Sequence, residues 1–294
     1  MSQGSAGAPG PRELPDYRRR RLVAAVALNA VLIIVAAGFA APFYWMFISS
    51  IRPLSETIAF PVQVLPGHVT FDNFIRLLTQ TNFGRTLVNS VIIAAVVSAG
   101  AALFCSMAGY ALAHLRFRGR QLLFFLVIAT MLLPATVQLV PNFYVLSNLG
   151  LLNTWWALIL PSVAPAIGIF WMRQYIRATL NPEVLDAARM DGASEYRIFW
   201  QVVLPLSIPG VSALAVFVAV QSWNEFVLPF IYLQDPDSLT FPPRLIQFFP
   251  NAGQLTRPYD LIMAGAVLGA IPMVILFLRF QRYFVPALTW RSDE

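Results

Sequence analysis

The chain contains no lysine, and all 20 of its basic residues are arginine. A phosphate-binding P-loop needs a lysine after its glycines, so the chain does not hydrolyse ATP by that mechanism. A single cysteine, Cys105, excludes an intrachain disulfide. The two histidines, His68 and His114, fall in different parts of the chain and cannot form a metal cluster together. Neither a metal site nor a catalytic residue is expected, and a membrane enzyme has no supporting group of residues.

Charged residues are scarce as well, at 12% of 294 residues against about 25% in a soluble domain. Hydrophobic residues make up 58%, which is enough for several membrane spans. The sequence therefore predicts an all-α, polytopic membrane protein that lies in a lipid bilayer. The net charge of +6 comes from arginines divided among short loops, a pattern that favours control of topology over nucleic-acid binding.

Six apolar runs are long enough to cross a bilayer as helices. Carboxylates are almost absent from them, which argues against a carrier that works through buried acids. Prolines interrupt the third and fourth runs, and kinked helices around a pathway or simple packing irregularity would both account for them. The runs cover roughly 22–48, 86–113, 121–145, 155–176, 207–232 and 261–281, and the interrupting prolines are Pro134, Pro141, Pro161 and Pro165.

The arginines also predict the orientation, because loops on the cytoplasmic side of a membrane carry the excess of basic residues. With a cytoplasmic N-terminus, 15 of the 20 arginines fall on that side, and both termini are cytoplasmic. We expect residues 1–21 to be a disordered cytoplasmic segment, 22–290 the transmembrane domain with its core at 86–281, and 291–294 a cytoplasmic tail. The first run is too long for a cleaved signal and is expected to be a span.

Two long outer loops each contain a short amphipathic segment. In TFDNFIRLL, Thr70 can cap a helix that places Phe71, Phe74 and Leu78 on one face. FPPRLIQFF in residues 233–259 is a second candidate. Such helices could shape the outer mouth of a pathway or pack on their own bundle.

Polar residues within the apolar runs are candidates for lining a pathway. On one continuous helix, Glu225 would lie about 27 Å from the start of the fifth run near Ser207. Asn224 and Glu225 could hydrogen-bond a polar solute, or they could anchor the helix at the interface beside Trp223. The same two interpretations apply to Gln138, Asn142 and Gln221.

The segment NPEVLDAARMDGASEYRIFWQVVLP, residues 181–205, separates the fourth and fifth runs on the cytoplasmic side. Asn181 is a good N-cap, Pro182 suits the first helical position and Glu183 places negative charge in the first turn. Gly192 can end this helix and Ser194 can cap a second one. The pattern predicts short cytoplasmic helices that dock a soluble partner.

This segment resembles the EAA loop of ABC-importer permeases. The pattern is Glu-Ala-Ala, three residues, Gly, nine residues, an aliphatic residue, any residue and Leu-Pro; here Asp186-Ala187-Ala188, Gly192, Val202 and Leu204-Pro205 keep its spacing. Asp186 replaces the usual glutamate, which keeps the charge and shortens its reach. The segments LRFRGR, GLLNTWWALILP, SWNEFVLPF and LRFQRYFVPALT extend the resemblance, over about 22–290, to the carbohydrate-uptake group and its MalG-like permeases.

The resemblance implies a permease subunit in a bacterial plasma membrane. It would form the pathway with a second permease, receive solute from an extracytoplasmic binding protein, and be driven by two ATPase chains that bind ATP and Mg²⁺. Glycerophosphodiester importers have similar permeases, and an ion-coupled carrier or channel without an ATPase is the alternative class. The residues that the resemblance assigns to ATPase coupling are Glu183, Asp186, Ala187, Ala188, Asp191, Gly192, Leu204 and Pro205.

Overall fold

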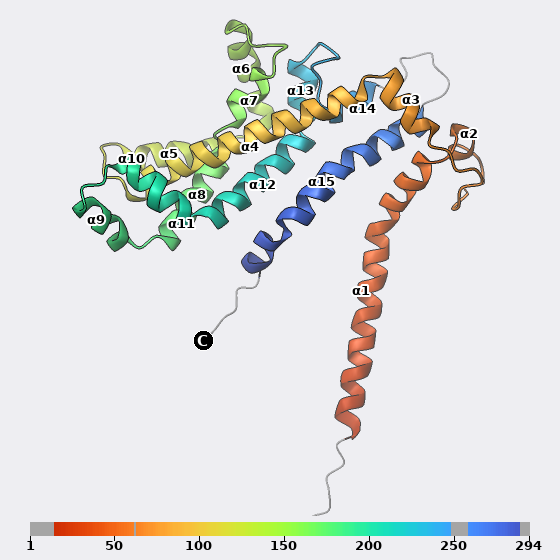
Figure 1. Ribbon diagram of the computed structural model, residues 1–294, viewed down its shortest axis with the longest axis horizontal. Helices are drawn as coiled ribbons and strands as arrows, with labels where there is room; N and C mark the ends of the chain where they lie inside the picture. The colour runs from red at the N-terminus through yellow and green to blue at the C-terminus, as the bar shows by residue number, and fades with distance from the viewer. Residues whose placement is uncertain (1–14, 62, 248–257, 289–294) are drawn as a thin grey trace, which may run out of the picture.

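The computed structural model describes residues 15–61, 63–247 and 258–288, without the side chains of 15–19 and 281–288. Within these ranges every regular element is a helix and no strand occurs, as the sequence predicts (Figure 1). The elements in chain order are α1 (Pro15–Ser50), α2 (Leu54–Thr57), α3 (Asp72–Gln80), α4 (Phe83–His114), α5 (Arg120–Met131), α6 (Ala135–Asn148), α7 (Trp156–Ser162), α8 (Ala166–Thr179), α9 (Pro182–Met190), α10 (Glu195–Ile198), the π-helical turn η1 (Phe199–Val203), α11 (Leu204–Leu206), α12 (Ile208–Asn224), α13 (Val227–Tyr232), α14 (Phe241–Gln247) and α15 (Tyr259–Leu288).

Four helical stretches are long and apolar enough to cross a bilayer, namely α1, α4, α7 with α8, and α15. Two bent pairs also qualify if each is counted as one span: α5 with α6, and Glu195–Leu206 with α12. The described residues therefore contain four to six candidate spans, where the sequence predicts six.

The expected span at 121–145 is two helices, because α5 and α6 meet at an angle of 107°. Pro134 takes an extended conformation at the break (φ −56°, ψ 139°) and has no N–H with which to continue α5. The side-chain amide of Gln138 donates to the carbonyl oxygens of Thr130 and Leu133, each 3.4 Å away. These bonds link α6 to the last turn of α5 across the break.

The expected continuous helix at 207–232 is also broken, because α12 ends at Asn224 and α13 begins at Val227. Glu225 is extended (ψ 123°), and its carboxylate accepts the N–H groups of Val227 at 3.0 Å and Leu228 at 3.1 Å. A continuing helix is disfavoured because the ring of Pro229 would clash with the carbonyl four residues earlier, at Glu225. Glu225 is therefore a helix cap at the break and does not lie inside a continuous helix.

Helix α4 lies at the centre of the bundle and packs on α8 and α12. At Gly109 the backbones of α4 and α8 come so close that a Cβ atom would lie 2.8 Å from the Arg173 nitrogen and the Met172 Cβ. Buried residues of α4, α7, α8, α9, η1 and α12 form the main hydrophobic core. A smaller core of Leu77, Phe83, Leu261 and Ala264 joins α3, α4 and α15 at the outer end.

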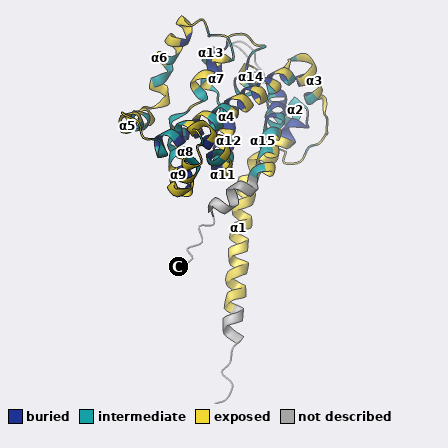
Figure 2. Ribbon diagram, turned by 60° about the vertical axis from the view of Figure 1, so that its left-hand side comes forward, coloured by how far each residue is buried: buried dark blue, intermediate teal, exposed yellow. Residues whose placement is uncertain are grey.

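Helix α1 stands apart from the other helices, and most of its described length is exposed (Figure 2). It packs on α15, and its side chains become buried only near its last residues, from Ile48 to Ser50. The helix begins at Pro15, so residues 15–21, which were expected to be disordered, are helical; residues 1–14 and the expected tail at 291–294 lie outside the described part.

Both short amphipathic helices occur, and most of the apolar face predicted for the first one is exposed. In α3, Asn73 and Leu77 are buried, whereas Phe71 and Leu78 are exposed. Asn73 faces inward because its amide donates to the carbonyl oxygens of Ser50 and Arg52, both at 2.9 Å. The second, α14, covers the first seven residues of FPPRLIQFF, and Phe248 and Phe249 lie outside the described residues.

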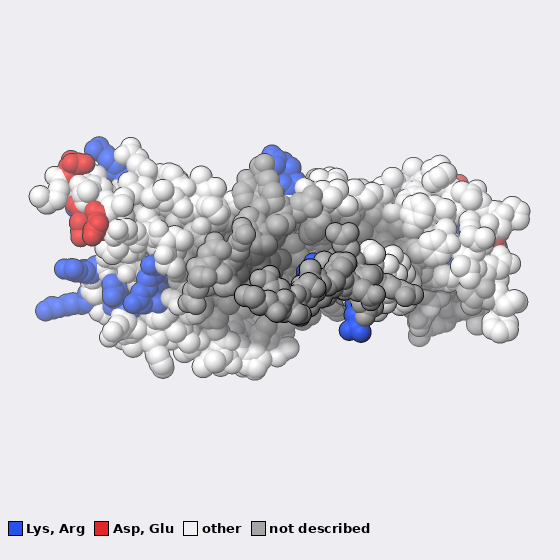
Figure 3. All heavy atoms as spheres, turned by 90° about the horizontal axis from the view of Figure 1, so that it is seen from below, with Lys and Arg blue, Asp and Glu red and all other residues white. Residues whose placement is uncertain are grey.

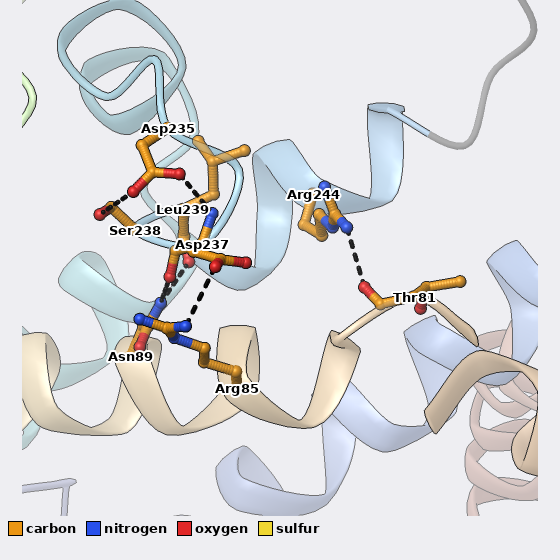
Figure 4. A network of polar contacts seen from close by, with 8 residues as sticks. All are labelled: Thr81, Arg85, Asn89, Asp235, Asp237, Ser238, Leu239 and Arg244. Atoms are coloured by element: carbon orange, nitrogen blue, oxygen red, sulfur yellow. Dashed lines mark hydrogen bonds and ion pairs between the residues drawn. The ribbon is translucent and has the colours of Figure 1, made fainter. Parts of the chain in front are cut away.

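The loop at residues 233–240 is joined to α4 by a network of polar contacts (Figure 4). The amide of Asn89 donates to the carbonyl oxygens of Asp237 at 2.8 Å and Leu239 at 3.1 Å, and Arg85 pairs with Asp237 at 3.0 Å. The hydroxyl of Ser90 accepts the N–H of Phe241 at 2.7 Å. These bonds hold the loop against the first two turns of α4.

Candidate functional site

The EAA loop, residues 181–205, begins with a helix whose two ends are capped as the sequence predicts. The side-chain oxygen of Asn181 accepts the N–H of Glu183 at 3.1 Å, and Pro182 occupies the first helical position. Gly192 has a φ of +78°, and the N–H groups of Gly192 and Ala193 donate to the carbonyls of Arg189 and Ala188. This pair of bonds is the Schellman motif that ends many helices, and it confirms Gly192 as the residue after the C-cap.

A second helical stretch follows the turn and runs through α10, η1 and α11 to Ser207. The hydroxyl of Ser194 accepts the N–H of Arg197 at 3.4 Å, which confirms the predicted cap. Leu185 of α9 and Ile198, Phe199 and Val203 of this stretch are buried in the main core. The loop is therefore a rigid helical hairpin seated on the bundle.

The predicted coupling residues lie mostly on the outside of this hairpin. Glu183, Asp186, Ala187, Asp191, Gly192 and Pro205 are exposed, and Ala188 and Leu204 are half-buried against the core. Figure 3 shows acidic and arginine side chains gathered at the end of the molecule that carries α9 and α10. Six of the eight predicted coupling residues are therefore accessible from outside the bundle.

Asp186 belongs to a chain of polar contacts that runs from α9 to α4. Its Oδ1 lies 2.7 Å from Nη1 of Arg189, whose Nε lies 2.8 Å from Oε1 of Glu195. The hydroxyl of Tyr110 donates to Oε2 of Glu195. The hydrogen bond from Arg189 lowers the pKa of Glu195, and the same bond raises the pKa of Arg189. Both groups are therefore charged at neutral pH.

Exposed apolar side chains on the hairpin are functional candidates that the motif did not reveal. Met190 is 88% exposed, Tyr196 67% and Trp200 40%. Tyr196 and Trp200 line a surface hollow of about 370 Å³ with Arg197 and Gln201. The signal was in the sequence, since these large apolar residues occur in a segment outside the predicted spans.

An inner cavity of about 280 Å³ lies between α4, α7, α12 and α13. Most of its wall is apolar, including Ile93 and Val97 of α4. Of the predicted pathway residues it contains Gln221 and Glu225. Its other polar residues, Ser162, Ser222 and Thr240, were not predicted.

The remaining pathway candidates lie elsewhere. Asn224 borders a separate apolar hollow between α1, α12 and α15, and its amide donates to the carbonyl of Val220 at 2.8 Å. Gln138 and Asn142 are on α6, where Gln138 bonds across the α5–α6 break. Among the residues with described positions, no three His, Cys, Asp or Glu side chains are placed to hold a metal ion.

The family described as binding-protein-dependent transport system inner membrane component matches residues 105–290. The arabinooligosaccharides transport system permease protein AraQ of Halalkalibacterium halodurans is 38% identical over 251 residues, which cover 84% of this chain and 88% of that protein. The sn-glycerol-3-phosphate transport system permease protein UgpE of Yersinia pestis is 32% identical, over 88% of this chain and 94% of that protein.

A solved structure shares the fold. One chain of a bacterial ABC transporter involved in the import of the acidic polysaccharide alginate aligns with a TM-score of 0.79 and 25% identity. The alignment covers 94% of this chain and 100% of that one.

Proposed function

We infer that this chain, which belongs to the family of binding-protein-dependent transport system inner membrane components, is a permease subunit of an ATP-driven importer for a sugar or sugar-like solute. It is a transport subunit and not an enzyme. The observation that carries its role in coupling is the EAA loop: a capped helical hairpin that keeps the family spacing and presents exposed apolar and charged side chains.

The membrane topology that we propose has six spans, with α5 and α6 forming the third span, α12 and α13 forming the fifth, and both termini in the cytoplasm. The bacterial plasma membrane is the expected location. The arginine distribution supports this orientation, because 15 of the 20 arginines fall on the side of the N-terminus and the EAA loop and only five on the side of the loops at 51–85 and 233–259. In this arrangement the EAA loop faces the cytoplasm and the loop at 233–240 faces outward.

The complex would contain two ATPase chains, which carry the ATP and Mg²⁺, and one of them would bind the exposed face of this EAA loop. Small residues allow close approach there, since Ala187 and Gly192 are exposed and no atom lies within 4 Å of a Cβ built on Gly192. Met190, Tyr196 and Trp200 supply the apolar contact that such interfaces concentrate at their centre. Glu183, Asp191 and Arg197 would form the charged rim.

A second permease would complete the pathway, and α1 is the element that most needs a neighbour. The 18-residue apolar window of α1 is not buried at all within the chain, whereas that of α4 is 33% buried. Lipid or a partner helix can cover such a surface. An extracytoplasmic solute-binding protein would deliver solute to the outer face.

The solute would be rich in hydroxyl groups, as the name of the 38% identical relative implies. Gln221, Ser162 and Ser222 of the inner cavity could bond such groups beside an apolar wall. The similarity to a glycerol-3-phosphate permease keeps a glycerophosphodiester as a second candidate. A thermal-shift screen of the co-encoded binding protein would separate them, because a bound ligand raises apparent stability.

Uptake by the complete transporter in proteoliposomes tests the proposal. We expect solute to accumulate only with ATP, the binding protein and both kinds of permease present. Uptake that continues without the ATPase chains would contradict the proposal and would favour an ion-coupled carrier or channel.

A further inference from the structure

Helix α9 is joined to the bundle by few contacts. Leu185 is its only buried residue, and the small side chain of Ala188 adds a partial contact. The turn after α9 passes through the exposed Gly192. Apolar packing therefore seats α9 at one point, and polar contacts near its C-terminal end decide how it is oriented.

Those contacts cross from α9 to α10 and then to α4. Arg189, near the end of α9, binds both carboxylate oxygens of Glu195, with Nε–Oε1 at 2.8 Å and Nη2–Oε2 at 3.5 Å. Glu195 opens α10 and also accepts the hydroxyl of Tyr110. The ring of Tyr110 is 3% exposed and packs on Phe199, with ring centres 6.2 Å apart.

Helix α4 connects Tyr110 to the inner cavity. Val97 and Ile93 lie on the same helix and form part of the cavity wall. The 13 residues between Tyr110 and Val97 correspond to about 20 Å of helix. The close crossing of α4 and α8 at Gly109 lies one residue from Tyr110, so a displacement of α4 there also moves α8.

We propose that Tyr110 and Glu195 are positioning residues, which hold α9 in a fixed orientation to α4 so that a movement of the EAA loop reaches the cavity wall. The proposal rests on the function inferred above. The Arg189–Glu195 pair is partly exposed, with side chains 35% and 45% accessible, and such pairs add little to folding stability. Its loss should therefore change coupling and leave the fold intact.

The test uses the complete transporter in proteoliposomes and measures solute taken up for each ATP hydrolysed. Tyr110→Phe removes one hydroxyl and Glu195→Gln removes the ionic partner of Arg189. We expect each to lower the ratio by about twofold to tenfold while thermal stability stays at the wild-type value. The uptake per ATP of the double variant should be no lower than that of the more affected single variant, because both changes interrupt one chain of contacts.

Tyr144→Phe, at an exposed tyrosine of α6, and Asp72→Asn, in the first turn of the outer helix α3, are the matched controls and should keep the wild-type ratio. An unchanged ratio in Tyr110→Phe or in Glu195→Gln would overturn the proposal. A wild-type transporter without ATP-dependent uptake would instead refute the proposed function.

Discussion

The two ends of α4 are held in different ways. At the N-terminal end, which is the outer end in the proposed topology, Asn89 and Ser90 bond to backbone groups of residues 237–241. At the C-terminal end, which is cytoplasmic in that topology, Tyr110 bonds to the side chain of Glu195, which is held in turn by Arg189. Asn89 and Ser90 therefore bond directly to the backbone, whereas Tyr110 reaches the EAA loop through a chain of side chains whose last two members, Glu195 and Arg189, are partly exposed.

The outer end has further bonds that do not involve α4. The side-chain oxygen of Asn153 accepts the N–H groups of Gln234 and Asp235 at 2.9 Å, and the indole of Trp155 donates to the carbonyl of Ser238 at 3.1 Å. The loss of one contact would leave the others in place. We therefore expect the outer end to act as a fixed support and the cytoplasmic end to be the place where a movement enters α4.

The largest effect is expected from Gly192→Trp in the EAA loop. The positive φ disfavours any side chain there, and the indole would occupy the surface that the ATPase approaches. We predict normal membrane insertion, no stimulated ATPase activity and no uptake. Gly119→Trp is the control, since Gly119 also has a positive φ of 87° and open space around it. Coupled uptake by Gly192→Trp at the control rate would show that the ATPase does not bind at this surface.

Asn89→Leu should have the next largest effect, which is a loss of folding stability. Asn89 is 3% exposed, and its loss leaves two carbonyls of the outer loop without this donor. Each buried group left unsatisfied costs about 1–3 kcal/mol. The apparent melting temperature of the purified transporter should fall, and the uptake per ATP of the folded fraction should not. If Asn89→Leu keeps the wild-type stability and only lowers uptake per ATP, the outer end of α4 is not the fixed support that we propose.

Arg85→Gln should have a smaller effect on stability. Its pair with Asp237 is exposed, with side chains 62% and 42% accessible, and such pairs contribute less than about 1 kcal/mol. Both melting temperature and uptake per ATP should stay close to the wild-type values. A drop in uptake per ATP as large as that of Glu195→Gln would contradict this, because it would show that the loss of an exposed ion pair at either end of α4 affects coupling.

The smallest effect is expected from pH. The pKa of Glu195 is lowered by Arg189, so the pair contributes stability above the unfolded-state pKa and loses it only as pH falls through the lower folded-state value. Between about pH 6 and about pH 8 the carboxylate stays charged, and uptake per ATP should not change because of it. A ratio that falls over this range in the wild type but not in Glu195→Gln would contradict this.

Local features of the EAA loop could be predicted because each cap depends on residues close in sequence. Asn181, Gly192 and Ser194 all act on groups within a few positions of themselves. The contact of Tyr110 with Glu195 could not be predicted, since 85 residues separate the two and only the packing of α4 against the loop brings them together.

The helix breaks were predicted less well. Pro229 is four residues after Glu225 and was a sufficient signal for a break, but the apolar run concealed it. On α3, hydropathy alone placed Phe71, Phe74 and Leu78 on one apolar face and did not show which residues are buried. The amide of Asn73 turns inward to carbonyls at the end of α1. The sequence of α3 alone does not reveal this contact, because the acceptor groups lie on another part of the chain.

Photo-crosslinking from the EAA loop would show directly whether this loop contacts the ATPase. A photoreactive residue at Met190, which is 88% exposed, should form an adduct with the ATPase chain in the assembled transporter. One at Leu132, which is 78% exposed at the α5–α6 break, should form none. The absence of an ATPase adduct at Met190, in a transporter that still accumulates solute with ATP, would contradict the account.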